Sequence, residues 1–215
     1  MSAPYYDADG VTIYHGDCRD VCADWYGLRT KPFDLLLTDP PYGLGDRWTG
    51  GTWGSDPMYT DARRWDARVP DGDLIALVSL ATDAIIWGGN YYRMPPSRCW
   101  LAWVKRSRMD TLADLELAWT TFDRPAKLIT EDRNPEGKRQ HPTQKPESVM
   151  LWALTQAPAT IVRVFDPFMG SGTTLAAAKR LGKIAIGIDC DERYCEIAAN
   201  RLRQAALPLF EGATA

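Results

Sequence analysis

Short apolar runs separated by polar and Gly-rich breaks recur along the chain, and this pattern predicts strands interleaved with helices. The run at 33–38 is almost continuously apolar and stops at Asp39-Pro40-Pro41, as expected of a buried strand in a parallel sheet. A shorter run at 12–15 stops at Gly16-Asp17. Strand-like runs follow at 84–87, 99–104, 116–122 and 126–129, and Asp73 is placed to cap a short helix before the first of them.

The C-terminal part of the chain alternates most clearly. Pro146 suits the first turn of a helix that runs to about residue 157, because the N–H group that proline lacks has no partner there. A strand at 161–165, a Gly-rich turn, a helix to about residue 181, a strand at 184–188 and an amphipathic helix over about 191–206 follow. Here a helix connects each strand to the next. Such a helix is the crossover connection that parallel strands need, so these strands are expected to lie in a parallel sheet.

Two stretches interrupt this alternation. Residues 43–68 have no sustained period and are rich in Gly, Trp and Asp, which predicts a long irregular flap of the kind that usually carries function. A polar stretch covers residues 131–144. Because no internal repeat or low-complexity segment divides the chain, we expect a single domain over residues 1–215.

The composition narrows the class of protein. With 25 Lys and Arg against 28 Asp and Glu, the 215 residues carry a net charge of −3, unlike a polybasic nucleic-acid coat or an acidic tail. No apolar run approaches the roughly 18 residues of a membrane span, and no secretory signal pattern is present at the start. Five cysteines without metal-ligand spacing, and two histidines far apart, predict free thiols and no metal site. We therefore expect a cytoplasmic protein.

The segment 165–174, FDPFMGSGTT, turns through two glycines between a predicted strand and a predicted helix. Such a turn lets backbone approach a ligand at the carboxyl edge of the sheet. Asp189 ends the next strand, where a carboxylate can accept hydrogen bonds from both ribose hydroxyls. The spacing favours an adenosine-containing cofactor, with an ordinary glycine turn as the alternative. The segment departs from GxGxxG and no P-loop Lys follows it, which disfavours a dinucleotide or ATP.

The tetrapeptide Asp39-Pro40-Pro41-Tyr42 directly follows a predicted strand. Its prolines fix φ and lack N–H donors, so the Pro40 carbonyl is an acceptor beside the Asp39 carboxylate. Two acceptors and an aromatic ring match the exocyclic amine of adenine or cytosine, whose lone pair is delocalised. Accepting both amine hydrogens frees this lone pair for in-line attack, while Tyr42 stacks on the extruded base. A proline-terminated strand with a capping Asp is the structural alternative.

Together these motifs resemble those of the amino-methylating DNA methyltransferases that use S-adenosylmethionine. DPPY precedes the cofactor glycines, which resembles the permuted order called the β group. The resemblance covers nearly the whole chain, because it extends to 16–18, 87–91, 103–106, HPTQKP at 141–146, and 187–189 with Tyr194. It implies an α/β, Rossmann-like methyltransferase fold with a mostly parallel central sheet and helices on both faces.

The resemblance also implies the roles of individual residues. The catalytic residues would be Asp39, Pro40, Pro41 and Tyr42. The residues around S-adenosylmethionine would be Asp17, Cys18, His141, Thr143, Lys145, Asp166, Pro167, Phe168, Gly170, Ser171, Gly172, Thr173 and Asp189. Asp189 stands where the family usually has Glu.

The implied function is site-specific methylation of the exocyclic amino group of adenine in double-stranded DNA, by a bacterial, archaeal or phage-encoded enzyme. Adenine is favoured because the tetrapeptide starts with Asp39, whereas members with Ser there tend to act on cytosine. Cytosine-N4 methylation, an RNA or nucleotide amino-methyltransferase, and a non-catalytic DNA-binding relative are the alternatives.

Recognition of the DNA sequence needs a surface beyond the catalytic and cofactor motifs. Permuted members often hold a sizeable recognition region where this chain has only a short segment, at about 123–140. We therefore expect the flap at 43–68 to close over the DNA, or a homodimer to supply a second surface. The flap offers cations for phosphate or guanine contacts and rings for stacking, at Arg47, Arg63, Arg64, Arg68, Trp48, Trp53 and Trp65.

Overall fold

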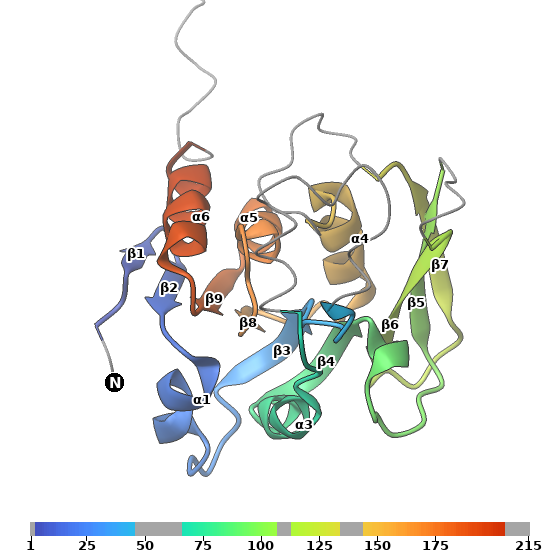
Figure 1. Cartoon of the computed structure of the whole chain (residues 1–215), viewed down its shortest axis with the longest axis horizontal. Helices are drawn as coiled ribbons and strands as arrows, with labels where there is room; N and C mark the ends of the chain where they lie inside the picture. Colours follow the sequence, from blue (N-terminus) through green and yellow to red (C-terminus); the bar gives the residue numbers. More distant parts are fainter. Residues whose placement is uncertain (1–2, 46–65, 107–112, 134–143, 205–215) are drawn as a thin grey trace, which may run out of the picture.

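The computed structural model of the chain describes residues 3–45, 66–106, 113–133 and 144–204. Within these residues nine strands form one sheet (Figure 1). The strands are β1 (Tyr6–Ala8), β2 (Val11–His15), β3 (Phe33–Thr38), β4 (Ala81–Trp87), β5 (Trp100–Lys105), β6 (Leu115–Thr120), β7 (Lys127–Glu131), β8 (Arg163–Asp166) and β9 (Ile184–Asp189). The helices are α1 (Cys18–Val21), α3 (Asp71–Ser79), α4 (Glu147–Gln156), α5 (Thr173–Arg180) and α6 (Glu192–Gln204), with 3₁₀ turns η1 (Ala23–Trp25) and η3 (Gly89–Tyr91).

The strands lie in the order β1-β2-β9-β8-β3-β4-β6-β5-β7. The five strands from β2 to β4 in this order are parallel to their neighbours. The two ends of the sheet differ, because β1 is antiparallel to β2 and β6 is antiparallel to both β4 and β5. The predicted mostly parallel sheet is therefore confirmed, and its parallel centre brings the carboxyl ends of five strands to one edge.

Helices cover both faces of the sheet, as predicted (Figure 1). Helices α4, α5 and α6 contribute to a core on one face, and α1 and α3 to a core on the other. Strand β3 lies between the two cores, with Leu35 and Leu37 in the first and Leu36 in the second, all fully buried. This burial on both faces explains why its sequence is continuously apolar rather than alternating.

The ends of the predicted strands and helices differ from the observed ones by up to three residues. The sequence analysis missed α1, both 3₁₀ turns and strand β1. A two-residue turn at Asp9 and Gly10 joins β1 to β2, and both residues have positive φ, 52° and 77°. Positive φ at both central positions matches the twist of a hairpin, and Asp-Gly is a sequence that favours it. In the described part of the chain, no helix is long and apolar enough to cross a membrane.

Candidate active site

Four aspartates lie at the carboxyl edge of the parallel strands. Asp166 and Asp189 are the last residues of β8 and β9, Asp39 directly follows β3, and Asp17 comes two residues after β2. Because these four strands are consecutive in the sheet, the edge holds a row of carboxyl groups contributed by distant parts of the sequence. The predicted catalytic tetrapeptide and much of the predicted cofactor site thus meet at one edge, where α/β proteins bind ligands.

The glycine turn that follows β8 has left-handed backbone at both glycines, with φ of 50° at Gly170 and 76° at Gly172. The Gly170 amide donates to Oδ2 of Asp189 at 3.0 Å, which ties the turn to the end of β9. Gly172 caps α5, and a Cβ added there would lie 2.7 Å from Cβ of Ala198 on α6. The second glycine therefore also serves the packing of α6, a role that the motif alone does not reveal.

Asp189 and Asp166 are held differently. Asp189 accepts the Gly170 amide and, at 2.8 Å, the amide of Asp191, and burial raises its pKa to about 6. Asp166 is 1% exposed and accepts the Thr38 hydroxyl at 2.7 Å, which joins β8 to β3, and burial raises its pKa to about 6 also. Asp166 is thus enclosed by protein donors, whereas Asp189 is partly accessible.

Asp17 and Cys18 lie at the start of α1, beside the end of β9. The Gly16 amide donates to the Asp189 carbonyl at 2.9 Å, which places Asp17 near that strand end. The Asp17 carboxylate accepts the Arg19 amide and the Arg19 guanidinium, both at 2.9 Å, and the hydrogen bonds from Arg19 lower its pKa. Cys18 is buried, and burial raises the pKa of its thiol to about 12, so it is neutral.

The remaining residues of the glycine motif surround the same turn. Pro167, Ser171 and Thr173 are buried, and Phe168 is half-buried. The Ser171 hydroxyl donates to Oε1 of Gln144 at 3.3 Å, so the segment before α4 contacts the turn. His141 and Thr143 lie outside the described residues.

Two tyrosine hydroxyls make hydrogen bonds to the predicted catalytic tetrapeptide, one from Tyr42 within it and one from Tyr92 outside it. The Tyr42 hydroxyl donates to Oδ1 of Asp39 at 2.7 Å. The Tyr92 hydroxyl lies 2.8 Å from the Pro40 carbonyl oxygen and 3.2 Å from that of Pro41. Each carbonyl oxygen has two lone pairs, so the Pro40 carbonyl keeps capacity for a second donor. Burial raises the pKa of Asp39, against the opposing effect of Lys145.

Lys145 lies at the tetrapeptide. Its Nζ atom is 2.6 Å from Oδ1 of Asp39, 2.9 Å from the Tyr42 hydroxyl and 3.1 Å from Oε2 of Glu116. The side chain is 3% exposed, and although burial opposes its charge, Asp39 and Glu116 raise its pKa overall. The residue predicted to contact the cofactor therefore contacts Asp39 and Tyr42, two of the predicted catalytic residues.

Glu116 on β6 and Lys105 at the end of β5 complete this cluster, and the sequence analysis did not identify either as a site residue. Oε1 of Glu116 pairs with Nζ of Lys105. Burial opposes the charge of Glu116, but Lys145 and Lys105 outweigh it and lower its pKa to about 2. A charged residue within the apolar strand LELAWT, with a lysine ending the preceding strand, was the available sequence signal.

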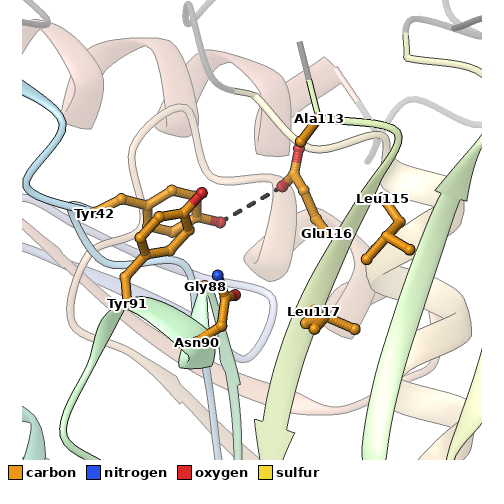
Figure 2. Close-up of a pocket in the computed structure, with 8 residues that line it drawn as sticks. All are labelled: Tyr42, Gly88, Asn90, Tyr91, Ala113, Leu115, Glu116 and Leu117. Carbon is orange, nitrogen blue, oxygen red and sulfur yellow. Dashed lines mark hydrogen bonds between the residues drawn. The ribbon is translucent and has the colours of Figure 1, made fainter. Parts of the chain in front are cut away.

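Beside this cluster lies an open pocket that is lined in part by Tyr42, Tyr91, Asn90, Glu116 and Leu117 (Figure 2). Gly88, Ala113 and Leu115 also line it. Figure 2 shows the Tyr42 and Tyr91 rings stacked at one side and the Glu116 carboxylate directed toward the Tyr42 hydroxyl. Aromatic and carboxylate groups therefore line the pocket beside the tetrapeptide.

The two ends of the predicted flap meet next to the tetrapeptide. The buried carboxylate of Asp66 accepts the amides of Gly43 at 2.8 Å and Leu44 at 3.2 Å. Arg68 is exposed at the C-terminal end of the flap. Residues 46–65, which contain the flap's other predicted DNA contacts, lie outside the described residues, as do residues 134–140 of the predicted recognition segment. Among the described residues, no group of three or more His, Cys, Asp or Glu is arranged to hold a metal ion.

The sequence of the chain is similar to those of known DNA methylases. Residues 86–200 match a family model described as DNA methylase. The Type II methyltransferase M2.LlaDCHI of Lactococcus lactis subsp. cremoris is 45% identical, over 96% of this chain and 94% of its own. The Type II methyltransferase M2.DpnII of Streptococcus pneumoniae is 46% identical, over 94% of this chain and 93% of its own.

Two solved structures share the fold. The PvuII DNA methyltransferase, which is cytosine-N4-specific, aligns with a TM-score of 0.63 and 12% identity, covering 97% of this chain and 90% of that chain. The M1.HpyAVI–SAM complex aligns with a TM-score of 0.56 and 23% identity, covering 89% of this chain and 98% of that chain. At these identities the similarity establishes the arrangement of strands and helices.

Proposed function

The chain belongs to the DNA methylase family, whose members transfer a methyl group from S-adenosylmethionine to an exocyclic amino group of a DNA base, and from this premise we propose that its target is the N6 amino group of adenine. The observation that carries the proposal is the pair of acceptors after β3. Oδ1 of Asp39 is engaged by Tyr42 and Lys145, while Oδ2 accepts no hydrogen bond from the described residues.

Oδ2 of Asp39, which has no donor among the described residues, and the Pro40 carbonyl suit an amine with two hydrogens. Each hydrogen finds one acceptor, which pulls the nitrogen toward tetrahedral geometry and exposes its lone pair to an incoming methyl group. After transfer the nitrogen carries one proton too many. The raised pKa of Asp39 makes this carboxylate a competent acceptor for that proton.

The residues at the ends of β8 and β9 fit S-adenosylmethionine. Asp189 offers a partly accessible carboxylate for the ribose hydroxyls, and Asp17 offers a second carboxylate beside it. The turn from Gly170 to Thr173 supplies backbone at the start of α5. When bound, the cofactor supplies a sulfonium-activated methyl group, and the chain's part is to place it opposite the amine.

The preference for adenine rests on Asp39, because related methyltransferases with Ser at this position tend to act on cytosine. Cytosine-N4 methylation is the second candidate, favoured by the shared fold with the cytosine-N4-specific PvuII enzyme. Both amines present two hydrogens to the same acceptors, so the outline of the pocket beside Tyr42 decides between them.

The test is to incubate the protein with S-adenosylmethionine and unmethylated genomic DNA, and with total RNA in parallel, and to analyse the nucleosides by mass spectrometry. We expect N6-methyladenine in DNA. N4-methylcytosine instead would overturn the assignment of the base, and methylation confined to RNA would overturn the assignment of the substrate. Asp39→Ala is the control for a contaminating activity.

We propose further that the enzyme acts on double-stranded DNA in the bacterial cytoplasm and that a homodimer supplies additional reading surface. The bacterial relatives support the cellular setting. Light scattering with and without a duplex tests the dimer.

A further inference from the structure

A buried, electrically balanced cluster lies behind the catalytic tetrapeptide. Lys145 and Lys105 contribute two positive charges, and Asp39 and Glu116 two negative charges. The three hydrogens of the Lys145 ammonium match the three acceptors around it: Oδ1 of Asp39, Oε2 of Glu116 and the Tyr42 hydroxyl. All three hydrogens of Lys145 are thus engaged. Asp39 and Tyr42 are expected to contact the base, and Glu116 is not.

Glu116 fixes where this ammonium lies. One of its oxygens pairs with Lys105 and the other with Lys145, so its carboxylate is held from both sides on β6. The low pKa of Glu116 keeps it ionised, and it therefore remains an anchor for Lys145 throughout the ordinary pH range. Lys145 in turn connects this fixed anchor on β6 to the tetrapeptide after β3.

We propose that Lys145 is a positioning residue for methyl transfer, whose ammonium, anchored by Glu116, holds Oδ1 of Asp39 and the Tyr42 hydroxyl so that Oδ2 of Asp39 is presented to the target amine. This inference rests on the proposed function. Without the ammonium, the carboxylate can rotate about its own bond, and its only remaining partner within the described cluster is the Tyr42 hydroxyl.

The charge of Lys145 has a second effect on Asp39. Among the described residues, the titratable groups that face this carboxylate are Lys145, Tyr42, Glu116 and, from β8, Asp166. Lys145 is the cation among them and the two carboxylates repel the charge on Asp39. Removing the cation raises the pKa of Asp39, so a smaller fraction is ionised at a given pH. Because protonation weakens the carboxyl group as an acceptor for the amine and as a base for its proton, the acidic limb of the rate profile moves to higher pH.

The experiment measures single-turnover methylation of a duplex across pH, and cofactor affinity by calorimetry, for wild type, Lys145→Met and Lys145→Arg. We expect Lys145→Met to move the acidic limb upward by about 1–3 pH units while cofactor affinity stays within a few-fold. Lys145→Arg keeps the positive charge but changes the geometry of the cationic group. We expect the acidic limb of its pH–rate profile to stay near that of wild type, with a lower maximal rate. Lys31→Met, exposed before β3 at the opposite edge of the sheet, is the matched control.

The double variant Glu116→Gln/Lys145→Met separates positioning from folding. It restores the balance of charge in the buried cluster, because Lys145→Met leaves one cation with two carboxylates. It therefore protects the fold, but Asp39 still lacks its cation. An upward shift that persists in the double variant supports the proposal. Return of the wild-type profile in the double variant would show that Lys145 only balances Glu116, and would overturn it.

Two further outcomes are distinguishable. In one, Lys145→Met loses cofactor affinity but keeps the wild-type pH–rate profile at saturating cofactor. This outcome would show that Lys145 binds the cofactor and would overturn the positioning role. Absence of methylation by the wild-type chain would overturn the proposed function, and this inference with it.

Discussion

The ring of Tyr91 lies flat against the ring of Tyr42, with centroids 4.8 Å apart and planes inclined by 15°. Tyr91 thus covers one face of the aromatic ring on which the target base is expected to stack. A base placed on the outer side of Tyr91 would be two ring spacings away from Tyr42, too far for its amine to reach Asp39. We therefore expect Tyr91 to leave this face when a base enters from this side.

Replacing Tyr91 with Ala should strengthen capture of the base. An aromatic pair contributes about 0.5–1.5 kcal/mol, so removing the competing ring should improve apparent base binding by about 2–10-fold. A duplex with 2-aminopurine at the target position reports extrusion as a rise in fluorescence. If Tyr91→Ala instead weakens the fluorescence change, Tyr91 is itself the stacking surface.

Asp39→Ala should abolish methylation while cofactor affinity changes by no more than a few-fold. The substitution removes an acceptor for the amine but leaves the ends of β8 and β9 unaltered. Single-turnover rates and calorimetric titration measure the two properties separately. Loss of both in parallel would contradict the separation of catalytic and cofactor-binding residues.

Asp189→Ala should weaken cofactor affinity by about 1.5–3 kcal/mol, the cost of removing a charged hydrogen-bond partner. Asp7→Ala, exposed on β1, is the control and should leave affinity unchanged. Unaltered affinity in Asp189→Ala would remove this residue from the ribose site.

The affinity of the wild-type chain should also depend on pH. The pKa of Asp189 is raised to about 6, so the carboxylate that accepts ribose hydroxyls is ionised above this value and becomes protonated below it. Cofactor affinity should therefore fall as the pH drops from 8 to 5, and Asp189→Ala should lose this part of the dependence. Calorimetry at matched ionic strength measures both.

Gly88→Ala should impair methylation and stability together. A Cβ at Gly88 would lie 2.1 Å from Cε1 of Tyr42, and the φ of 71° is strained for alanine, at a cost of about 1–3 kcal/mol. Gly72→Ala on α3 is the control, because nothing lies within 4 Å of its added Cβ. Thermal unfolding and methylation rates check both variants. A Gly88→Ala protein with normal activity would show that the Tyr42 ring can shift without consequence.

Replacing residues 46–65 with a Gly/Ser linker should abolish DNA binding and leave cofactor affinity intact. Asp66 is retained in this design because it holds Gly43 and Leu44 beside the tetrapeptide. DNA binding and sequence selectivity are measured apart from cofactor binding. Unchanged sequence selectivity would indicate that the segment at 123–140, and not the flap, recognises the DNA sequence.

The fold was predictable where a residue's neighbours in sequence determine its structure. Strand β3 followed from its continuous apolar run and its prolines, and the C-terminal strand–helix units from their alternation. Strand β1 was missed although Asp9-Gly10 marks its hairpin, because three residues carry too little periodicity. The site was harder, since Lys145 and Glu116 meet Asp39 only through the order of strands in the sheet. The motif placed Lys145 in a functional segment, but only the folded chain shows which group it touches.

Gln144 and Lys145 are adjacent in the chain, yet one contacts Ser171 in the glycine turn and the other contacts Asp39. A single peptide unit therefore joins the proposed cofactor-binding part of the edge to the part that is proposed to bind the base. Thermodynamic linkage makes such a connection reciprocal. If cofactor binding increases the affinity for the base by some factor, base binding increases the affinity for the cofactor by the same factor. The order in which the two substrates arrive would then alter the rates of assembly while leaving the stability of the ternary complex unchanged.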